Sequence, residues 1–115
     1  MKKTTLKKII KVNCRMTGNS ELFKNYENII DNMDPLYKLS VGKLLSVSYT
    51  PVVYVRNKKL NLPAACLWCY DDFYYLKTPI KIYIAEKIET VKDFINDYFY
   101  AGFSNRDVAV QHEDI

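Results

Sequence analysis

The sequence contains little glycine, a single histidine and no long apolar run, and each shortage excludes a class of protein. Three glycines in 115 residues, with 49% hydrophobic and 26% charged residues, are typical of a folded globular chain. No stretch approaches the roughly 18 unbroken apolar residues that cross a bilayer, so we expect no membrane segment. The motifs GxGxxG, GxSxG and HExxH are absent. The sequence therefore lacks the familiar motifs for dinucleotide binding, serine hydrolysis and zinc proteolysis.

The cysteine count and the first residues indicate a cellular compartment. Three cysteines are an odd number, whereas the disulfide framework of a small secreted domain needs an even one. The start MKKTTLKKIIKV is basic like a signal peptide, but Lys7, Lys8 and Lys11 interrupt the apolar stretch that a signal needs. We therefore expect a cytoplasmic protein that is not secreted. The excess of lysine over arginine, with abundant Asn, Ile and Tyr, is typical of an AT-rich genome such as that of a low-GC bacterium, a phage or a virus.

The net charge of +4 is unevenly distributed along the chain. The first 15 residues carry six cations and no acid, and the remaining hundred carry 11 basic and 13 acidic residues. A basic segment on a mildly acidic body predicts, as an alternative function, contact with nucleic-acid phosphates. The cations of this alternative are Lys2, Lys3, Lys7, Lys8, Lys11 and Arg15.

Alternation of apolar and polar residues predicts a strand-rich chain. β-branched and aromatic residues dominate its middle, as they do in sheets, and the adjacent aspartates Asp71 and Asp72 interrupt them at a hairpin-like corner. Strands are predicted over residues 10–16, 45–50, 52–56, 64–70, 73–76, 80–84 and 108–110.

Helical spacing of apolar residues predicts two helices. The first begins at an N-cap at Ser20 and ends at Asp34-Pro35, because the residue before proline avoids the α region. The second runs from about Ile88 to Ala101. Two helices are too few for a parallel sheet.

These elements predict an α+β fold. We expect an antiparallel sheet of about five strands with both amphipathic helices on one face. The nearest named topology is a ferredoxin-like βαββαβ arrangement with an extra hairpin. A single domain is expected over residues 1–115, with residues 111–115 fraying.

The stretch CLWCYDDFYY holds Cys66 and Cys69, whose spacing occurs in redox and zinc sites. On a regular strand, residues three apart point to opposite faces, so the two sulfurs neither pair nor share an ion. A zinc site would need Cys14 and His112 as further ligands, and their spacing fits no standard zinc module. We interpret the cysteines as small core residues and predict no cofactor. A metal- or thiol-dependent enzyme is kept as a second alternative.

Tyrosines concentrate on the predicted strands, and tyrosine is frequent at protein interfaces. With both helices on one face of the sheet, the other face is expected to meet a partner. Acidic residues four apart on the second helix repel one another, which suggests that they serve a contact. The predicted contacts are Tyr54, Tyr70, Tyr74, Tyr75 and Tyr83, with a charged rim of Asp71, Asp72, Glu89, Asp93 and Asp97.

These contacts predict a small non-catalytic binding protein that acts by occupying a surface of another macromolecule. Inhibitors and immunity-type proteins of phages and mobile elements have this size and composition. Another protein is the expected partner, nucleic acid is the alternative, and no membrane is involved. A homodimer, in which the basic first segment of one copy meets the acidic helix of the other, is a variant of the same prediction.

Overall fold

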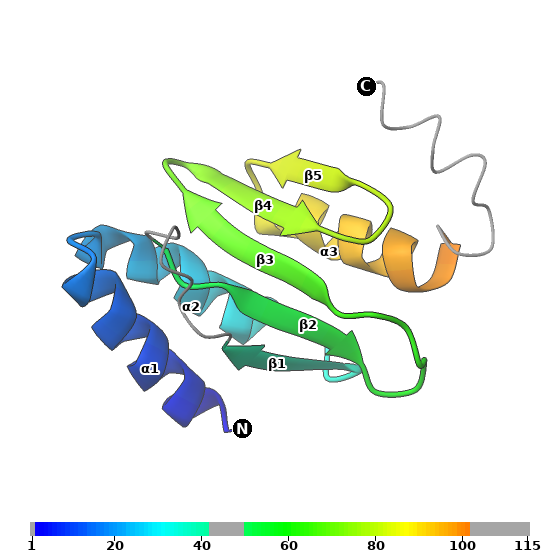
Figure 1. Ribbon diagram of the computed structural model, residues 1–115, viewed down its shortest axis with the longest axis horizontal. Helices are drawn as coiled ribbons and strands as arrows, with labels where there is room; N and C mark the ends of the chain where they lie inside the picture. Colours follow the sequence, from blue (N-terminus) through cyan, green and yellow to red (C-terminus); the bar gives the residue numbers. More distant parts are fainter. Residues whose placement is uncertain (1, 42–49, 102–115) are drawn as a thin grey trace.

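The computed structural model describes residues 2–41 and 50–101, which form three α-helices and a five-stranded antiparallel sheet (Figure 1). The predicted α+β class is confirmed. The predicted strand over 108–110, most of that over 45–50, and the tail 111–115 lie outside the described residues.

The five strands form a meander in which each strand pairs with the next one along the chain. The order in the sheet is β1-β2-β3-β4-β5, and every pair is antiparallel. The ferredoxin-like order is therefore not confirmed. The strands are β1 (Tyr37–Val41), β2 (Val53–Asn57), β3 (Ala65–Tyr70), β4 (Phe73–Lys77) and β5 (Ile82–Ala85).

The helices precede and follow this meander. The predicted helices correspond to α2 and α3, but Ser20 is not an N-cap, since it lies in a 3₁₀ turn and Leu22 occupies the N-cap position of α2. The helical elements are α1 (Lys3–Met16), the 3₁₀ turn η1 (Ser20–Leu22), α2 (Phe23–Asn32), α3 (Ile88–Asn96) and the π-helical turn η2 (Asp97–Ala101).

The strand predicted over residues 10–16 is wrong, because this segment belongs to α1. The residues that α1 buries are Leu6, Ile10 and Cys14, which recur every four positions as one face of a helix. A strand buries every second residue and this helix face buries every fourth, so residues 10 and 14 fit both patterns. The alternation therefore does not distinguish a strand from a helix in this segment. Val12 and Met16, which a strand would bury, are exposed.

Strand β1 was missed, although its pattern is regular. Tyr37, Leu39 and Val41 alternate with Lys38 and Ser40, and the first three lie toward the core. Its pairing with β2 places Leu39 opposite Val55, both on the same face of the sheet.

One hydrophobic core lies between the sheet and the helices. In Figure 1, α2 and α3 lie behind the sheet, and α1 lies beside α2 near β1. The fully buried residues of the core include Ile10, Tyr26, Ile29, Val53, Val55, Leu67, Cys69, Val91 and Ile95. The helices therefore cover one face of the sheet and no described helix covers the other.

Candidate functional site

The uncovered side of the sheet, which we call the open face, is built from alternate residues of each strand. Within β2, Val53 and Val55 are buried against the helices, so Tyr54 and Arg56 point the other way. The register of the strands extends this assignment across the sheet. The open face consists of Lys38, Ser40, Tyr54, Arg56, Cys66, Trp68, Tyr70, Phe73, Tyr75, Lys77, Ile82 and Ile84.

Large apolar side chains are exposed on the open face. Seven large hydrophobic side chains are exposed among the described residues, and four of them lie here. Ile82 and Ile84 are each 57% exposed, Tyr70 is 54% exposed and Phe73 is 36% exposed. Contiguous exposed apolar groups of this kind mark interaction surfaces in soluble proteins.

At the centre of the open face, Trp68 and Tyr75 stack on each other. They occupy directly opposite positions on β3 and β4, and their ring centroids lie 5.4 Å apart with an angle of 6° between the planes. One face of each ring is therefore partly occupied by the other ring, which leaves less aromatic surface for the stacking of nucleic-acid bases.

The charges on the open face are all positive. Lys38, Arg56 and Lys77 lie on it, and no Asp or Glu occurs within the five described strands. Acidic residues are found instead at one end, where Asp71 and Asp72 form the β3–β4 turn. A shallow depression beside this turn is lined by Gly18, Asn19, Ser20, Glu21, Leu22, Tyr70, Asp71, Asp72 and Phe73.

The predicted contact tyrosines do not share one surface. Tyr54, Tyr70 and Tyr75 lie on the open face as expected. The expectation that Tyr74 and Tyr83 lie there is wrong, because both point toward the helices and are buried. Alternation assigns neighbouring residues to opposite faces, but it does not say which set the helices cover.

Hydrogen bonds hold these two buried tyrosines within the core. The hydroxyl of Tyr74 accepts a hydrogen bond from the Asn28 amide at 3.0 Å. The hydroxyl of Tyr83 donates to the Asp97 carboxylate at 3.2 Å, and the Tyr83 ring lies 4.4 Å from that of Phe94. Asp97 is thus engaged within the chain.

The acidic helix lies away from the open face. Ile88, Val91 and Ile95 bury one side of α3 against the opposite face of the sheet. Glu89 and Asp93 are exposed on this helix layer. The predicted charged rim is therefore not one surface. Asp71 and Asp72 border the open face, whereas the acidic residues of the second helix lie on the other side of the sheet.

The two cysteines of CLWC point to opposite faces of β3, as the strand geometry predicted. Cys69 is fully buried in the core, and Cys66 is half-buried on the open face. Cys14 is also buried. Burial raises the pKa of the Cys14 thiol to about 11 and raises the pKa values of Cys66 and Cys69 as well. These thiols are protonated at neutral pH, and the thiolate is the form that attacks or binds metal.

No group of three His, Cys, Asp or Glu side chains converges on a metal-binding geometry among the described residues. His112, which a zinc site with Cys14, Cys66 and Cys69 would need, lies outside them. None of the helices in residues 2–41 and 50–101 combines the length and apolar character needed to cross a bilayer.

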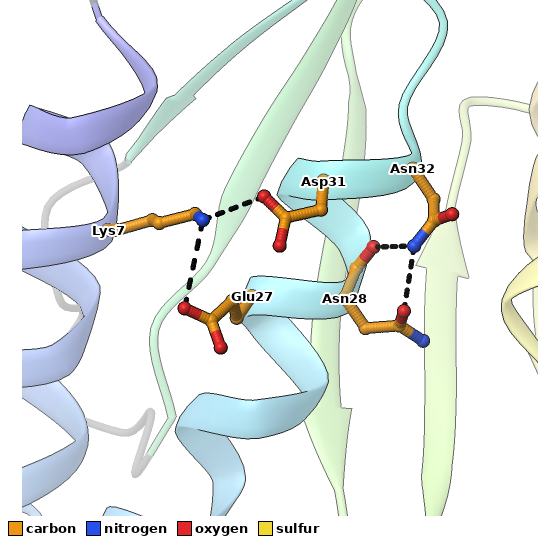
Figure 2. A network of polar contacts seen from close by, with 5 residues as sticks. All are labelled: Lys7, Glu27, Asn28, Asp31 and Asn32. Carbon is orange, nitrogen blue, oxygen red and sulfur yellow. Dashed lines mark hydrogen bonds and ion pairs between the residues drawn. The ribbon is translucent and has the colours of Figure 1, made fainter.

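Part of the basic first segment is engaged within the chain (Figure 2). From α1, the Lys7 ammonium group contacts Asp31 at 2.7 Å and Glu27 at 3.7 Å, both on α2. The hydrogen bond with Asp31 is the largest contribution that raises the pKa of Lys7. The Lys11 ammonium group lies 5.7 Å from the centre of the Phe23 ring. The exposed cations of this segment with neither an ion pair nor a ring contact among the described residues are Lys2, Lys3, Lys8 and Arg15.

Four large apolar residues of the open face were not among the predicted contacts. They are Trp68, which alternates with Tyr70 on β3, Phe73, which alternates with Tyr75 on β4, and Ile82 and Ile84 of the neighbouring strand β5. The alternation within residues 66–75 and 80–84 contained this signal, but the prediction considered tyrosine alone.

Comparison with known proteins assigns no relative. No protein-family model matches the chain, and neither the curated proteins nor the solved structures contain a match.

Proposed function

We propose that this chain is a small binding protein that acts by occupying a surface of another protein through the open face. The exposed apolar patch of Tyr70, Phe73, Ile82 and Ile84 beside the Trp68–Tyr75 stack carries this proposal. Aromatic residues at the centre of such a patch are the side chains that contribute most to protein binding. The small size of the chain supports a cytoplasmic role of the inhibitor or immunity type. Its composition, which is typical of an AT-rich genome, supports an origin in a phage or mobile element.

The charge of the open face defines the chemistry of the partner. Lys38, Arg56 and Lys77 lie toward the end of the open face that is opposite Tyr70 and Phe73, and no carboxylate occurs on the strands. A complementary surface is apolar at its middle and carries Asp or Glu at its rim. These opposite charges would accelerate association and select the partner more than they would raise affinity.

The experiment begins with affinity capture from cells of the natural host, followed by binding measurements with the purified candidate partner. Trp68 is the only tryptophan and lies at the centre of the open face, so its fluorescence reports docking directly. Tyr70→Ser and Phe73→Ser are expected to raise the dissociation constant by about tenfold or more, because each removes an exposed aromatic anchor.

Met16→Ser is the matched control, because Met16 is 75% exposed but lies on α1 and belongs neither to the open face nor to the depression beside Tyr70 and Phe73. It should leave both the affinity and the Trp68 emission change unaffected. Equal affinities for Tyr70→Ser, Phe73→Ser and Met16→Ser would contradict the proposal. So would a partner that binds without changing the emission of Trp68.

A further inference from the structure

The two edges of the sheet are different in character. At one edge, β1 carries the charged Lys38 and has α1 against it. At the other edge, no described strand lies beyond β5. Within Ile82–Ala85 there is no proline and no charged residue, which are the features that usually protect an edge from pairing.

The hydrogen-bonding direction of β5 follows from the β4–β5 turn. The Thr78 N–H donates to the Lys81 carbonyl at 2.9 Å, which makes Thr78 and Lys81 a hydrogen-bonded pair. Such pairs alternate along an antiparallel ladder, so Tyr83 also bonds toward β4. Ile82 and Ile84 therefore direct their N–H and C=O groups away from β4, toward the side of β5 that no described strand occupies.

The β3–β4 pairing gives the same result independently. The two-residue turn at Asp71-Asp72 makes Tyr70 and Phe73 a hydrogen-bonded pair, so Tyr75 bonds toward β3. Its neighbours in β4 then bond toward β5, where their partners are Tyr83 and Ala85. Both derivations leave Ile82 and Ile84 as the outward-bonding residues of β5.

We propose that the β5 edge pairs with the β5 edge of a second copy of this chain, in antiparallel orientation about Tyr83. Ile82 of each copy then lies opposite Ile84 of the other, and the four outward N–H groups find the four outward carbonyls. The edge is self-complementary, because the outward-bonding residues lie symmetrically on either side of Tyr83. Such an arrangement has the two-fold symmetry that most homodimers use.

The side chains agree with this pairing. Ile82 and Ile84 are each 57% exposed and lie on the open face, so pairing would join four isoleucines into one apolar row. The Lys81 ammonium group lies 4.5 Å from the centre of the Tyr83 ring, and Tyr83 faces the helices, so this cation does not interrupt the row.

The geometry extends the proposed function. A two-fold axis perpendicular to the sheet keeps both open faces on the same side, so ten strands would form one continuous surface. The dimer would present two docking faces side by side and could hold a two-fold symmetric partner at two points. Binding of both faces would increase the apparent affinity through effective concentration.

The test measures mass and amide exchange in the full chain without any partner protein. Light scattering or sedimentation should give twice the 13.5 kDa of one copy, shifting to the monomer on dilution. Hydrogen exchange followed by NMR should show that the amides of Ile82 and Ile84 become protected as protein concentration rises. The amides of Tyr83 and Ala85, which bond to β4, should be protected at every concentration.

Two variants of one residue separate backbone pairing from side-chain contact. Ile84→Pro removes an outward N–H while leaving the β4–β5 ladder intact, and each dimer loses two hydrogen bonds. This loss should raise the dissociation constant of the dimer by about thirtyfold. Ile84→Ala keeps the N–H and should weaken the dimer less.

Several results would overturn the proposal. One is a monomer throughout the micromolar to millimolar range with freely exchanging Ile82 and Ile84 amides. Another is a dimer that Ile84→Pro does not weaken. Protection of these amides only after a different protein is added would assign the edge to that protein instead. None of these results depends on whether the open face docks a partner.

Discussion

The hydroxyl of Tyr26 accepts a hydrogen bond from the backbone N–H of Cys69 at 3.1 Å, across the core from α2 to β3. The same hydroxyl donates to the Pro51 carbonyl at 2.6 Å. The register that pairs Val53 with Leu67 would place Pro51 opposite Cys69, so the tyrosine hydroxyl stands between two groups that a longer ladder would join directly. A helix side chain thus completes the hydrogen bonding of β3 where its pairing with β2 ends.

Tyr26→Phe should lower the free energy of unfolding by about 1–3 kcal/mol, because a buried donor and a buried acceptor lose their common partner. Urea denaturation measures the change. Tyr70→Phe is the matched control, since its hydroxyl belongs to a side chain that is 54% exposed, and it should leave stability unchanged. Equal stabilities of both variants would show that the Tyr26 bridge contributes nothing.

The elements that the sequence predicted best have one unambiguous period. Residues 64–76 alternate around a two-aspartate corner and form β3 and β4, and the opposed directions of Cys66 and Cys69 follow from that alternation. In residues 10–16, a strand pattern and a helix pattern both bury Ile10 and Cys14. A strand was predicted there, whereas the segment is part of α1. Only the packing of α1 against α2 distinguishes the two.

The open face could be predicted only in part for a related reason. Residues 73–76 place aromatic or apolar side chains on both faces of β4, so composition does not reveal which face the helices cover. Tyr74 and Tyr75 are identical residues at adjacent positions with opposite environments. The pairing of Trp68 with Tyr75 likewise depends on the strand register, which a turn fixes and alternation alone does not.

Asp71 sets that register through its backbone conformation. Its φ of +52° lies in the left-handed region, which aspartate tolerates better than β-branched residues do. Asp71→Val should therefore lower the free energy of unfolding by about 1–2 kcal/mol, whereas Asp71→Asn should be nearly neutral. Asp72→Val is the control, because Asp72 has no positive φ. Similar losses at both positions in urea denaturation would contradict this explanation.

The buried thiol of Cys14 should make stability depend on pH under alkaline conditions. Burial raises its pKa from the ordinary value of 9.0 to about 11 in the folded chain. Between these values the unfolded chain releases a proton that the folded chain retains, so unfolding becomes more favourable as pH rises. The contribution of Cys14 to stability is full below about pH 9 and is lost as pH rises through about 11.

Cys14→Ala should reduce the slope of unfolding free energy against pH in this window, although the variant is less stable at every pH. Val53→Ala provides the control, because it also removes fully buried atoms but no ionisable group, and its slope should equal that of the wild type. Urea denaturation at several pH values between 8 and 11 measures both slopes. Parallel curves for Cys14→Ala and the wild type would refute the prediction.

Adjacent lysines of α1 distinguish a structural cation from one free to contact phosphate. Lys7 contacts Asp31 and Glu27, whereas Lys8 is exposed with no described ion pair. Lys7→Gln should lower the melting temperature at low salt, with the difference shrinking at high salt as the ion pairs are screened. Lys8→Gln should leave the melting temperature unchanged.

The same pair of variants tests the nucleic-acid alternative. If the first segment binds duplex DNA, affinity falls steeply with salt, with a slope of about −0.9 per neutralised phosphate. Lys8→Gln should then reduce the magnitude of that slope by about one, and Lys7→Gln should change it less. Anisotropy of a labelled duplex measures binding. A response that is flat with salt removes the alternative.

Tyr74 and Tyr75 offer the sharpest separation of stability from binding. Tyr74 is 7% exposed in the core, so Tyr74→Ala should lower the free energy of unfolding by about 3 kcal/mol or more. Tyr75 is half-buried and stacks on Trp68 across the open face, so Tyr75→Ala should cost much less stability while weakening partner binding by about tenfold. Denaturation and Trp68 fluorescence titration measure the two effects on the same samples. Loss of stability with Tyr75→Ala as large as with Tyr74→Ala would mean that the Trp68–Tyr75 stack serves the fold, and the proposed docking face would lose its centre.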